Sequence, residues 1–391
     1  MVGGVRLLFT SLGSFGHTFP LVPLAVAARE AGHDVVFATS EDFLPQLTKA
    51  GLDTAAAGLA IKDAFGQAFG QVFGDAGPPG PPGDIPREVL FPVVAKVFGE
   101  LMPKRFLADL LPLFEHVRPD LVVSEAGNSG GAFAALKAGL PVVSHGFGRV
   151  STGDPMTTMI REAILSHAGE LGIEVGEDLT FGGPFVDICP ESVQDPDFLA
   201  RTHRVPLRPV GWSEPGELPP GVLDKRRPLV YLTLGTAMGH AGVLGEAIAG
   251  LSGLDVDVLV ATGPSLPEDA LGEVPANVRL EAWVPQAALL PHVDLVVHHG
   301  GSGTTLGAFG EGLPQLLLPQ GADQFTNADA VFAAGVGDRL LGAEVTAEAV
   351  ATKARHLLTD TAVRDAARAL AAEVAAMPSP ADVAAELPTL A

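Results

Sequence analysis

The sequence has little cysteine, little positive charge and no long apolar run, and each shortage excludes a class of protein. A single cysteine, Cys189, rules out an intramolecular disulfide and suits a reducing compartment. Only 24 lysines and arginines stand against 46 aspartates and glutamates, and the net charge of −22 argues against nucleic acid and anionic membranes as partners. No segment reaches the roughly 18 uninterrupted apolar residues of a membrane span, and none resembles a signal peptide. We therefore expect a cytoplasmic protein.

What is present predicts two α/β domains. The chain has 391 residues, 47% of them hydrophobic and 18% charged, a length that suits two domains of about 150–200 residues. Apolar runs that end in glycine-rich turns alternate with helical patterns, first over 5–146 and again from 228 onward. This alternation is typical of βαβ units on a parallel sheet. We predict an N-terminal domain over 1–208, a proline-rich linker over 209–227 and a second domain over 228–375.

The two halves resemble each other in sequence. "DLVVSEAGNSGGAFAALKAGLP" (120–141) is echoed by "DLVVHHGGSGTTLGAFGEGLP" (294–314), and "VRLLFTSLGSFGH" (5–17) by "PLVYLTLGTAMGH" (228–240). Two similar Rossmann-like domains facing each other across a cleft are the natural expectation, with ligands at the carboxyl ends of the parallel strands. The alignment of the longer pair places Glu125 and His299 at equivalent strand ends, which suggests a different task in each half.

The turn "HHGGSGTT" (298–305) has the features of a diphosphate site. Its glycines let a ligand approach the backbone, its hydroxyls donate hydrogen bonds, and the helix that follows directs N–H groups and its dipole at an anion. His298 and His299 can donate a hydrogen bond or carry positive charge. The turn matches neither the P-loop nor the G-x-G-x-x-G fingerprint. The alternative is a structural glycine turn with two satisfied histidines.

Residues on either side of this turn could bind the rest of a nucleotide sugar. Trp283 follows a predicted strand and could stack on a nucleobase, although a lone tryptophan is more often part of a core. Asp323 and Gln324 offer a carboxylate and an amide to sugar hydroxyls. Asp323 could instead be the N-cap of the next helix.

At these residues the chain resembles a known family. "WVPQ…HHGGSGTT…EGLPQLLLPQGADQ", spanning 283–324, resembles the donor signature of family 1 glycosyltransferases of the GT-B fold that decorate antibiotics in actinomycetes. Within that family the chain looks most like the deoxysugar transferases of enediyne (calicheamicin-type) biosynthesis, and the likeness covers nearly its whole length. The resemblance implies that residues 376–391 form a helix that packs back on the first domain. It also implies a set of donor-binding residues: Gly235, Thr236, Trp283, Val284, His299, Gly301, Ser302, Gly303, Thr304, Asp323 and Gln324.

One departure from the family pattern bears on the donor. UDP-sugar users of this family often carry a glutamate, which bonds both ribose hydroxyls, at the position that is Gly307 here. Loss of that acceptor suits a deoxyribose, so we expect a TDP-sugar as co-substrate. No group of histidines, cysteines and carboxylates has metal-ligand spacing, so we expect no metal and no cofactor.

His17 is the candidate general base. Transfer of a sugar to a hydroxyl needs a group near neutral pKa to take the hydroxyl proton, and "GSFGHTFP" matches the Gly-His-x-x-Pro turn of the family. Glu125, at the end of another strand of the same predicted sheet, is the candidate that orients His17, although the family more often has an aspartate there. Attack opposite the leaving diphosphate would invert the anomeric carbon. The alternative for His17 is a helix-start histidine that caps a carbonyl.

The acceptor is expected to be a large apolar aglycone, of the polyketide or enediyne kind. Residues predicted to line its site are Gly16, His145, Phe91 and Phe147, and for the aromatic residues a place in the core is the alternative. Two other functions remain open: a sugar-nucleotide 2-epimerase of the same fold, and a non-catalytic auxiliary protein that activates a partner transferase. A homodimer is left open as the oligomeric state.

Overall fold

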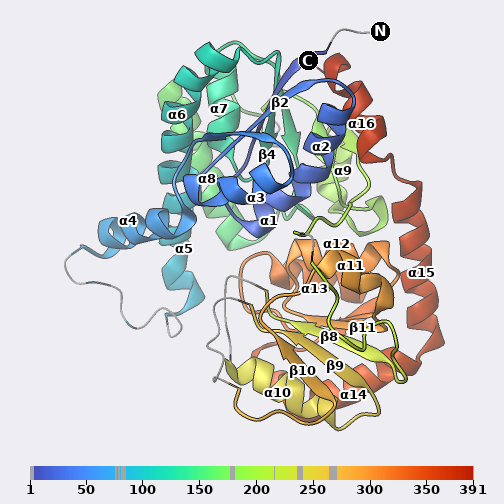
Figure 1. Ribbon diagram of the computed structural model, residues 1–391. Coiled ribbons are helices and arrows are strands. Elements are labelled where there is room, and N and C mark those ends of the chain that lie inside the picture. The colour runs from blue at the N-terminus through green and yellow to red at the C-terminus, as the bar shows by residue number, and fades with distance from the viewer. Residues whose placement is uncertain are drawn as a thin grey trace. The chain divides into compact units, whose positions relative to one another are not determined.

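The computed structural model describes residues 4–74, 77, 80, 85–176, 181–214, 216–235, 241–263 and 271–390. The chain divides into two compact units (Figure 1). Unit 1 consists of Met1–Ile188, Asp195–Leu207 and Pro378–Ala391, and unit 2 of Cys189–Gln194 and Arg208–Met377. Within the described residues, no helix is long and apolar enough to cross a membrane.

Unit 1 is built on a parallel sheet. Its described residues form seven strands in the order β3-β2-β1-β4-β5-β6-β7. The strands are β1 (Arg6–Thr10), β2 (Asp34–Thr39), β3 (Asp53–Ala56), β4 (Leu121–Glu125), β5 (Val142–His145), β6 (Phe185–Asp187) and β7 (Arg204–Pro206). The central strands β1 and β4 are almost wholly buried, as expected of parallel strands that are covered on both faces by crossover helices.

Helices cover both faces of this sheet. Figure 1 shows α6, α7 and α8 on one side and α2 and α16 on the other, and α16 packs on α2. The helices of unit 1 are α1 (Phe15–Thr18), α2 (Val22–Glu30), α3 (Leu44–Lys49), α4 (Ile61–Phe73), α5 (Arg87–Lys96), α6 (Met102–Val117), α7 (Ser129–Lys137), α8 (Pro155–Leu171), α9 (Pro196–Arg201) and α16 (Pro380–Glu386). A π-helical turn, Val97–Leu101, joins α5 to α6.

Unit 2 repeats the plan with a sheet whose described strands number six, in the order β10-β9-β8-β11-β12-β13. The strands are β8 (Leu229–Thr233), β9 (Asp257–Ala261), β10 (Val278–Glu281), β11 (Leu295–His298), β12 (Gln315–Leu317) and β13 (Gly337–Arg339). Its helices are α10 (Ala241–Ser252), α11 (Gln286–Leu289), α12 (Ser302–Gly310), α13 (Gln324–Ala333), α14 (Ala347–Thr359) and α15 (Thr361–Ala376). One side of its core is formed by apolar side chains of α10, α14 and the sheet.

The sequence echo corresponds to equivalent places in the two sheets. β4 lies next to β1, and β11 lies next to β8. The aspartate before each strand makes the same contact, because Asp120 accepts a hydrogen bond from the Arg6 N–H and Asp294 one from the Leu229 N–H, both at 2.8 Å. The carboxyl ends of β4 and β11 are therefore the equivalent positions at which to look for a site.

Candidate active site

The turn after β1 and the end of β4 bring His17 and Glu125 together. His17 lies in the single-turn helix α1, and Glu125 is the last residue of β4. Nδ1 of His17 lies 3.1 Å from Oε1 of Glu125. The carboxylate side chain is completely buried, whereas the imidazole side chain keeps 22% of its surface exposed. A buried carboxylate therefore faces one ring nitrogen of a histidine that solvent, or a bound molecule, can reach.

The backbone after β4 holds Glu125 in this position. The Gly127 N–H donates a hydrogen bond to Oε1 of Glu125 at 2.5 Å. A Cβ at Gly127 would lie 2.9 Å from that oxygen and 3.2 Å from Cε1 of His17, so glycine is needed for the close approach. Asn128 caps α7 through the Gly131 N–H and donates to Thr10 Oγ1 at 3.1 Å, which ties β4 to β1.

The predicted acceptor residues are spread over several segments of unit 1. Phe147, in the loop after β5, packs on His17 with ring centroids 4.5 Å apart. Gly16 is exposed beside His17, and Phe91 is half-buried on α5. His145 has no exposed surface, which favours a role inside the protein over a place in the wall of an acceptor site.

In unit 2, His299 occupies a slot between two glycines. A Cβ at Gly235 would lie 2.7 Å from its Nε2, and a Cβ at Gly301 would collide with the same nitrogen. Burial lowers the pKa of His299 to about 4, against the opposing effects of the Asp323 carboxylate and the Thr233 carbonyl. The ring is thus neutral at neutral pH and can donate one hydrogen bond. Of the two roles predicted for His299, hydrogen-bond donation and positive charge, the lowered pKa favours hydrogen-bond donation.

His298 supports the turn from within the core. The Gly300 N–H donates to its Nδ1 at 3.2 Å, which leaves the proton on Nε2 to be donated to Gln315 Oε1 at 2.9 Å. Gln315 in turn lies 3.5 Å from the Thr305 carbonyl through its amide nitrogen. Burial lowers the pKa of His298 to about 3. Of the two roles predicted for His298, the enclosed ring favours hydrogen-bond donation over charge.

A second network joins the start of α12 to the loop before α13. Ser302 donates to Asp323 Oδ2 at 2.8 Å, and Asn327 donates to the same oxygen at 3.0 Å. Asn327 also donates to the Gly300 carbonyl at 2.9 Å. Asp323 precedes α13, but its side chain does not cap that helix.

Gln324 has its amide oxygen occupied by the loop itself. That oxygen accepts hydrogen bonds from the Gln320 and Gly321 N–H groups at 2.7 and 3.0 Å. Its amide nitrogen is the atom that could meet a sugar hydroxyl.

The remaining donor-side residues differ in exposure. Trp283 is 47% exposed, whereas Val284 is buried. Thr304 is mostly buried and donates to Gln286 Oε1 at 3.1 Å, while Gly303 is exposed at the first turn of α12. Thr236 lies outside the described residues.

Four supporting residues were not identified from the sequence: Gly127, Gln286, Gln315 and Asn327. Gln315 had a readable signal, because a glutamine inside an apolar strand must find a buried partner. Gln286 is part of the quoted "WVPQ" motif, but its partner Thr304 is remote in sequence. Among the described residues, no group of three or more histidines, cysteines and carboxylates is arranged to hold a metal ion.

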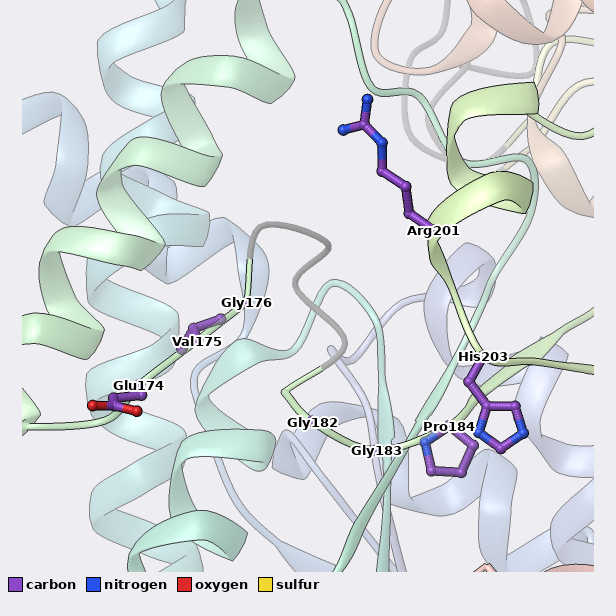
Figure 2. A pocket seen from close by; sticks show the side chains of 8 residues that line it. All are labelled: Glu174, Val175, Gly176, Gly182, Gly183, Pro184, Arg201 and His203. Atoms are coloured by element: carbon purple, nitrogen blue, oxygen red, sulfur yellow. The ribbon is translucent and has the colours of Figure 1, made fainter.

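A hollow of about 620 Å³ lies elsewhere in unit 1 (Figure 2). Gly183 and Pro184 precede β6 and His203 precedes β7, so the hollow borders the amino ends of these strands, while Glu125 ends β4 at the opposite edge of the sheet. Figure 2 shows Glu174 on one side of it, with Arg201 and His203 on the other. It is separate from the His17–Glu125 pair.

Two family models match the chain. The N-terminal domain of erythromycin biosynthesis protein CIII-like proteins matches residues 26–215, and their C-terminal domain matches residues 245–390. L-demethylnoviosyl transferase of Streptomyces niveus is 34% identical over 97% of this chain and 97% of its own. Elloramycin glycosyltransferase ElmGT of Streptomyces olivaceus is 35% identical over 98% of this chain and 97% of its own.

Solved structures show the same architecture. Spinosyn rhamnosyltransferase SpnG, complexed with thymidine diphosphate, is 29% identical with a TM-score of 0.78, over 98% of this chain and 99% of its own. The calicheamicin glycosyltransferase CalG4 is 20% identical with a TM-score of 0.77, over 99% of this chain and 98% of its own. The predicted GT-B fold is confirmed, and the likeness to the calicheamicin enzyme is one of fold.

Proposed function

Because this chain belongs to the erythromycin biosynthesis protein CIII-like family of glycosyltransferases, we propose that it moves a deoxysugar from a TDP-sugar to a hydroxyl of a large apolar aglycone. His17 is the general base, and the anomeric carbon is inverted. The observation that carries the proposal is the contact between the buried Glu125 carboxylate and the partly exposed His17 ring at 3.1 Å.

In this proposal residues of unit 1 take the proton from the acceptor hydroxyl. Nδ1–H of His17 points to Glu125, and Nε2 is assigned to the acceptor hydroxyl. As the hydroxyl oxygen attacks, Nε2 takes its proton and the imidazolium that forms is stabilised by the carboxylate. Glu125 stays an anion throughout, because its task is to fix the tautomer and balance the new charge.

In this proposal residues of unit 2 bind the leaving diphosphate and stabilise its charge. The bond from the anomeric carbon to the phosphate oxygen breaks while the bond to the acceptor oxygen forms on the opposite face, which accounts for inversion. Charge grows on the diphosphate, and the first turn of α12 with the His299 hydrogen bond stabilises that charge. The proposed diphosphate-binding residues are His299, Gly301, Ser302, Gly303 and Thr304, together with Gly235 and Thr236, which follow β8 in the sequence.

The sugar and the base of the donor meet the remaining residues. Asp323 and Gln324 bind sugar hydroxyls, Trp283 stacks on the nucleobase, and backbone groups of Val284 pair with its edge. Two observations favour thymidine: a relative of 29% identity has been solved with thymidine diphosphate, and Gly307 offers no side chain to a ribose 2′-hydroxyl. Calorimetric titration should show TDP binding more tightly than UDP, and equal affinities would contradict this part of the proposal.

The acceptor is proposed to be a polyketide-type or enediyne-like aglycone that contacts Gly16, Phe91 and Phe147. Relatives named L-demethylnoviosyl transferase and elloramycin glycosyltransferase support a natural-product acceptor. Incubation of TDP-deoxysugars with a panel of such aglycones should give glycosides, and failure with every member would count against this acceptor class. Epimerised TDP-sugar without any acceptor would point to the 2-epimerase instead.

The decisive experiment replaces the base. His17→Ala should lower turnover by about 10²–10⁴-fold, the usual contribution of a general base. The affinity for TDP should stay at the wild-type value, because the proposed diphosphate-binding residues belong to unit 2. Turnover that persisted at the wild-type rate would remove His17 from the mechanism.

A further inference from the structure

Among the buried polar atoms of unit 1 that have no hydrogen-bond partner within the described residues, two belong to neighbouring strands of the sheet. They are Oε2 of Glu125 and Nε2 of His145. Glu125 is 1% exposed and His145 is not exposed at all. Buried polar atoms are nearly always satisfied by protein or by ordered water, so this pair needs an explanation.

The sheet places these two side chains next to each other. In the parallel pairing of β4 with β5, Glu125 is the register partner of His145. Register partners on neighbouring strands project to the same face of the sheet, and the strands lie about 4.8 Å apart. β1, which leads to His17, lies on the other side of β4. Glu125 therefore stands between two histidines, with Oε1 toward His17.

The hydrogen-bond donors and acceptors of the pair define what can join them. Nδ1 of His145 lies 2.7 Å from the Gly146 carbonyl, so it carries the ring proton and Nε2 is an acceptor. Burial lowers the pKa of His145 to about 4, which keeps the ring neutral. The Glu125 carboxylate is also an acceptor. Two acceptors cannot bond each other, but one water molecule can donate a hydrogen bond to both.

The second unit shows that this strand position does not require a polar residue. Val296 pairs with Gln315 in β11 and β12 as Val122 pairs with Val142 in β4 and β5. By this register the equivalent of His145 is Leu318, which is fully buried. A leucine is the less costly residue in such an enclosed place. The histidine in unit 1 therefore has a local reason.

We propose that His145 is a positioning residue for Glu125, which it holds through one enclosed water molecule that donates to Nε2 of His145 and to Oε2 of Glu125. The proposal rests on the proposed function, since it assigns to Glu125 the task of orienting His17. In this proposal a series of hydrogen bonds runs from His17 to Glu125, from Glu125 to the water molecule, and from the water molecule to His145.

Two conservative substitutions separate the two ring nitrogens. His145→Gln keeps a polar atom near the position of Nε2 and loses the bond to the Gly146 carbonyl. His145→Asn keeps the donor near Nδ1 and loses the acceptor. We expect His145→Asn to lower kcat about tenfold, the loss typical of a residue that orients a functional group, with KM for the donor unchanged. His145→Gln should retain most of the wild-type kcat.

Each other result would overturn the proposal. If Asn is tolerated and Gln is not, His145 acts through the Gly146 carbonyl. If both variants are active, or both lose kcat equally, Nε2 has no special role. The proposed function is tested separately, by His17→Ala and Glu125→Gln. The two His145 variants can therefore fail without contradicting the role of His17 as the base.

A second measurement needs neither variants nor activity. A high-resolution crystal structure of the unaltered protein should show an ordered water within hydrogen-bond distance of both Oε2 and Nε2. An empty space there, or a direct contact between the two atoms, would contradict the proposal even if the variants failed to fold.

Discussion

The two units place a histidine at the carboxyl edge of a sheet, but they surround it differently. In unit 1 the histidine comes from the turn after the first strand, and the equivalent of His299 is a carboxylate, Glu125. In unit 2 the histidine follows β11, and glycines enclose it. His17 keeps solvent access beside the buried Glu125 side chain, whereas burial lowers the pKa of His299 to about 4. The same residue type, placed after different strands of two similar sheets, therefore suits proton transfer in one unit and neutral hydrogen bonding in the other.

The strongest test of this contrast removes the anion from unit 1. Glu125→Gln keeps the shape but not the charge, and we expect turnover to fall about 100-fold because the imidazolium loses its partner. Wild-type kcat in this variant would show that His17 does not depend on the carboxylate of Glu125.

The matching change in unit 2 should affect the donor instead. A Cβ at Gly301 would collide with His299, while its extended backbone (φ −62°, ψ 141°) accepts alanine without strain. We expect Gly301→Ala to weaken TDP binding about tenfold, a loss of about 1.4 kcal/mol, by displacing the ring. Gly245→Ala on α10, where a Cβ meets nothing within 4 Å, is the control. If calorimetry gave equal TDP affinities for the two variants, the position of His299 beside Gly301 would not matter for TDP binding.

Removal of the exposed tryptophan should have a smaller effect. Trp283→Ala would lose the stacking on the base, worth about 0.5–1.5 kcal/mol, or a several-fold rise in Kd for TDP. Trp283→Phe should recover part of the affinity. Fluorescence or calorimetric titration measures both, and unchanged affinity in the alanine variant would place the nucleobase elsewhere.

The smallest effect is on stability in acid, and it should differ between the units. Burial lowers the pKa of His298 to about 3 and that of His299 to about 4, below the ordinary 6.5. The unfolded chain then binds more protons than the native one, so stability falls as pH drops below about 6.5 and on toward 4. Of the described histidines whose pKa is lowered in this way, His298 and His299 lie in unit 2 and His145 lies in unit 1.

Thermal unfolding followed from pH 7 downward should therefore show unit 2 losing stability first. His298→Gln removes one titrating group and should flatten this dependence, although it also lowers Tm at pH 7. An unaltered slope in that variant would mean that His298 titrates normally in the folded protein.

The fold and the family could be predicted from the sequence because repeated local patterns of residues identify both. The strands before Glu125 and His299 are apolar runs closed by glycine turns, and their echo placed them at equivalent sheet positions. The protonation of His298 and His299 was not predictable, because the letters "HHGG" do not say that both rings are enclosed. The bonds from His298 to Gln315 and from Asn327 to Gly300 join residues far apart in sequence, and no local period reveals such pairs.

The course of the chain through the two units has a consequence for engineering hybrids with its relatives. After unit 2 ends at Met377, the chain returns to unit 1, where Val383, Ala384 and Leu387 are buried and α16 packs on α2. A chimera spliced at a single point near residue 208 would carry a foreign α16 against the native α2. Exchange of unit 2 between parents therefore calls for two crossovers, near 208 and near 377, so that the last helix stays with unit 1.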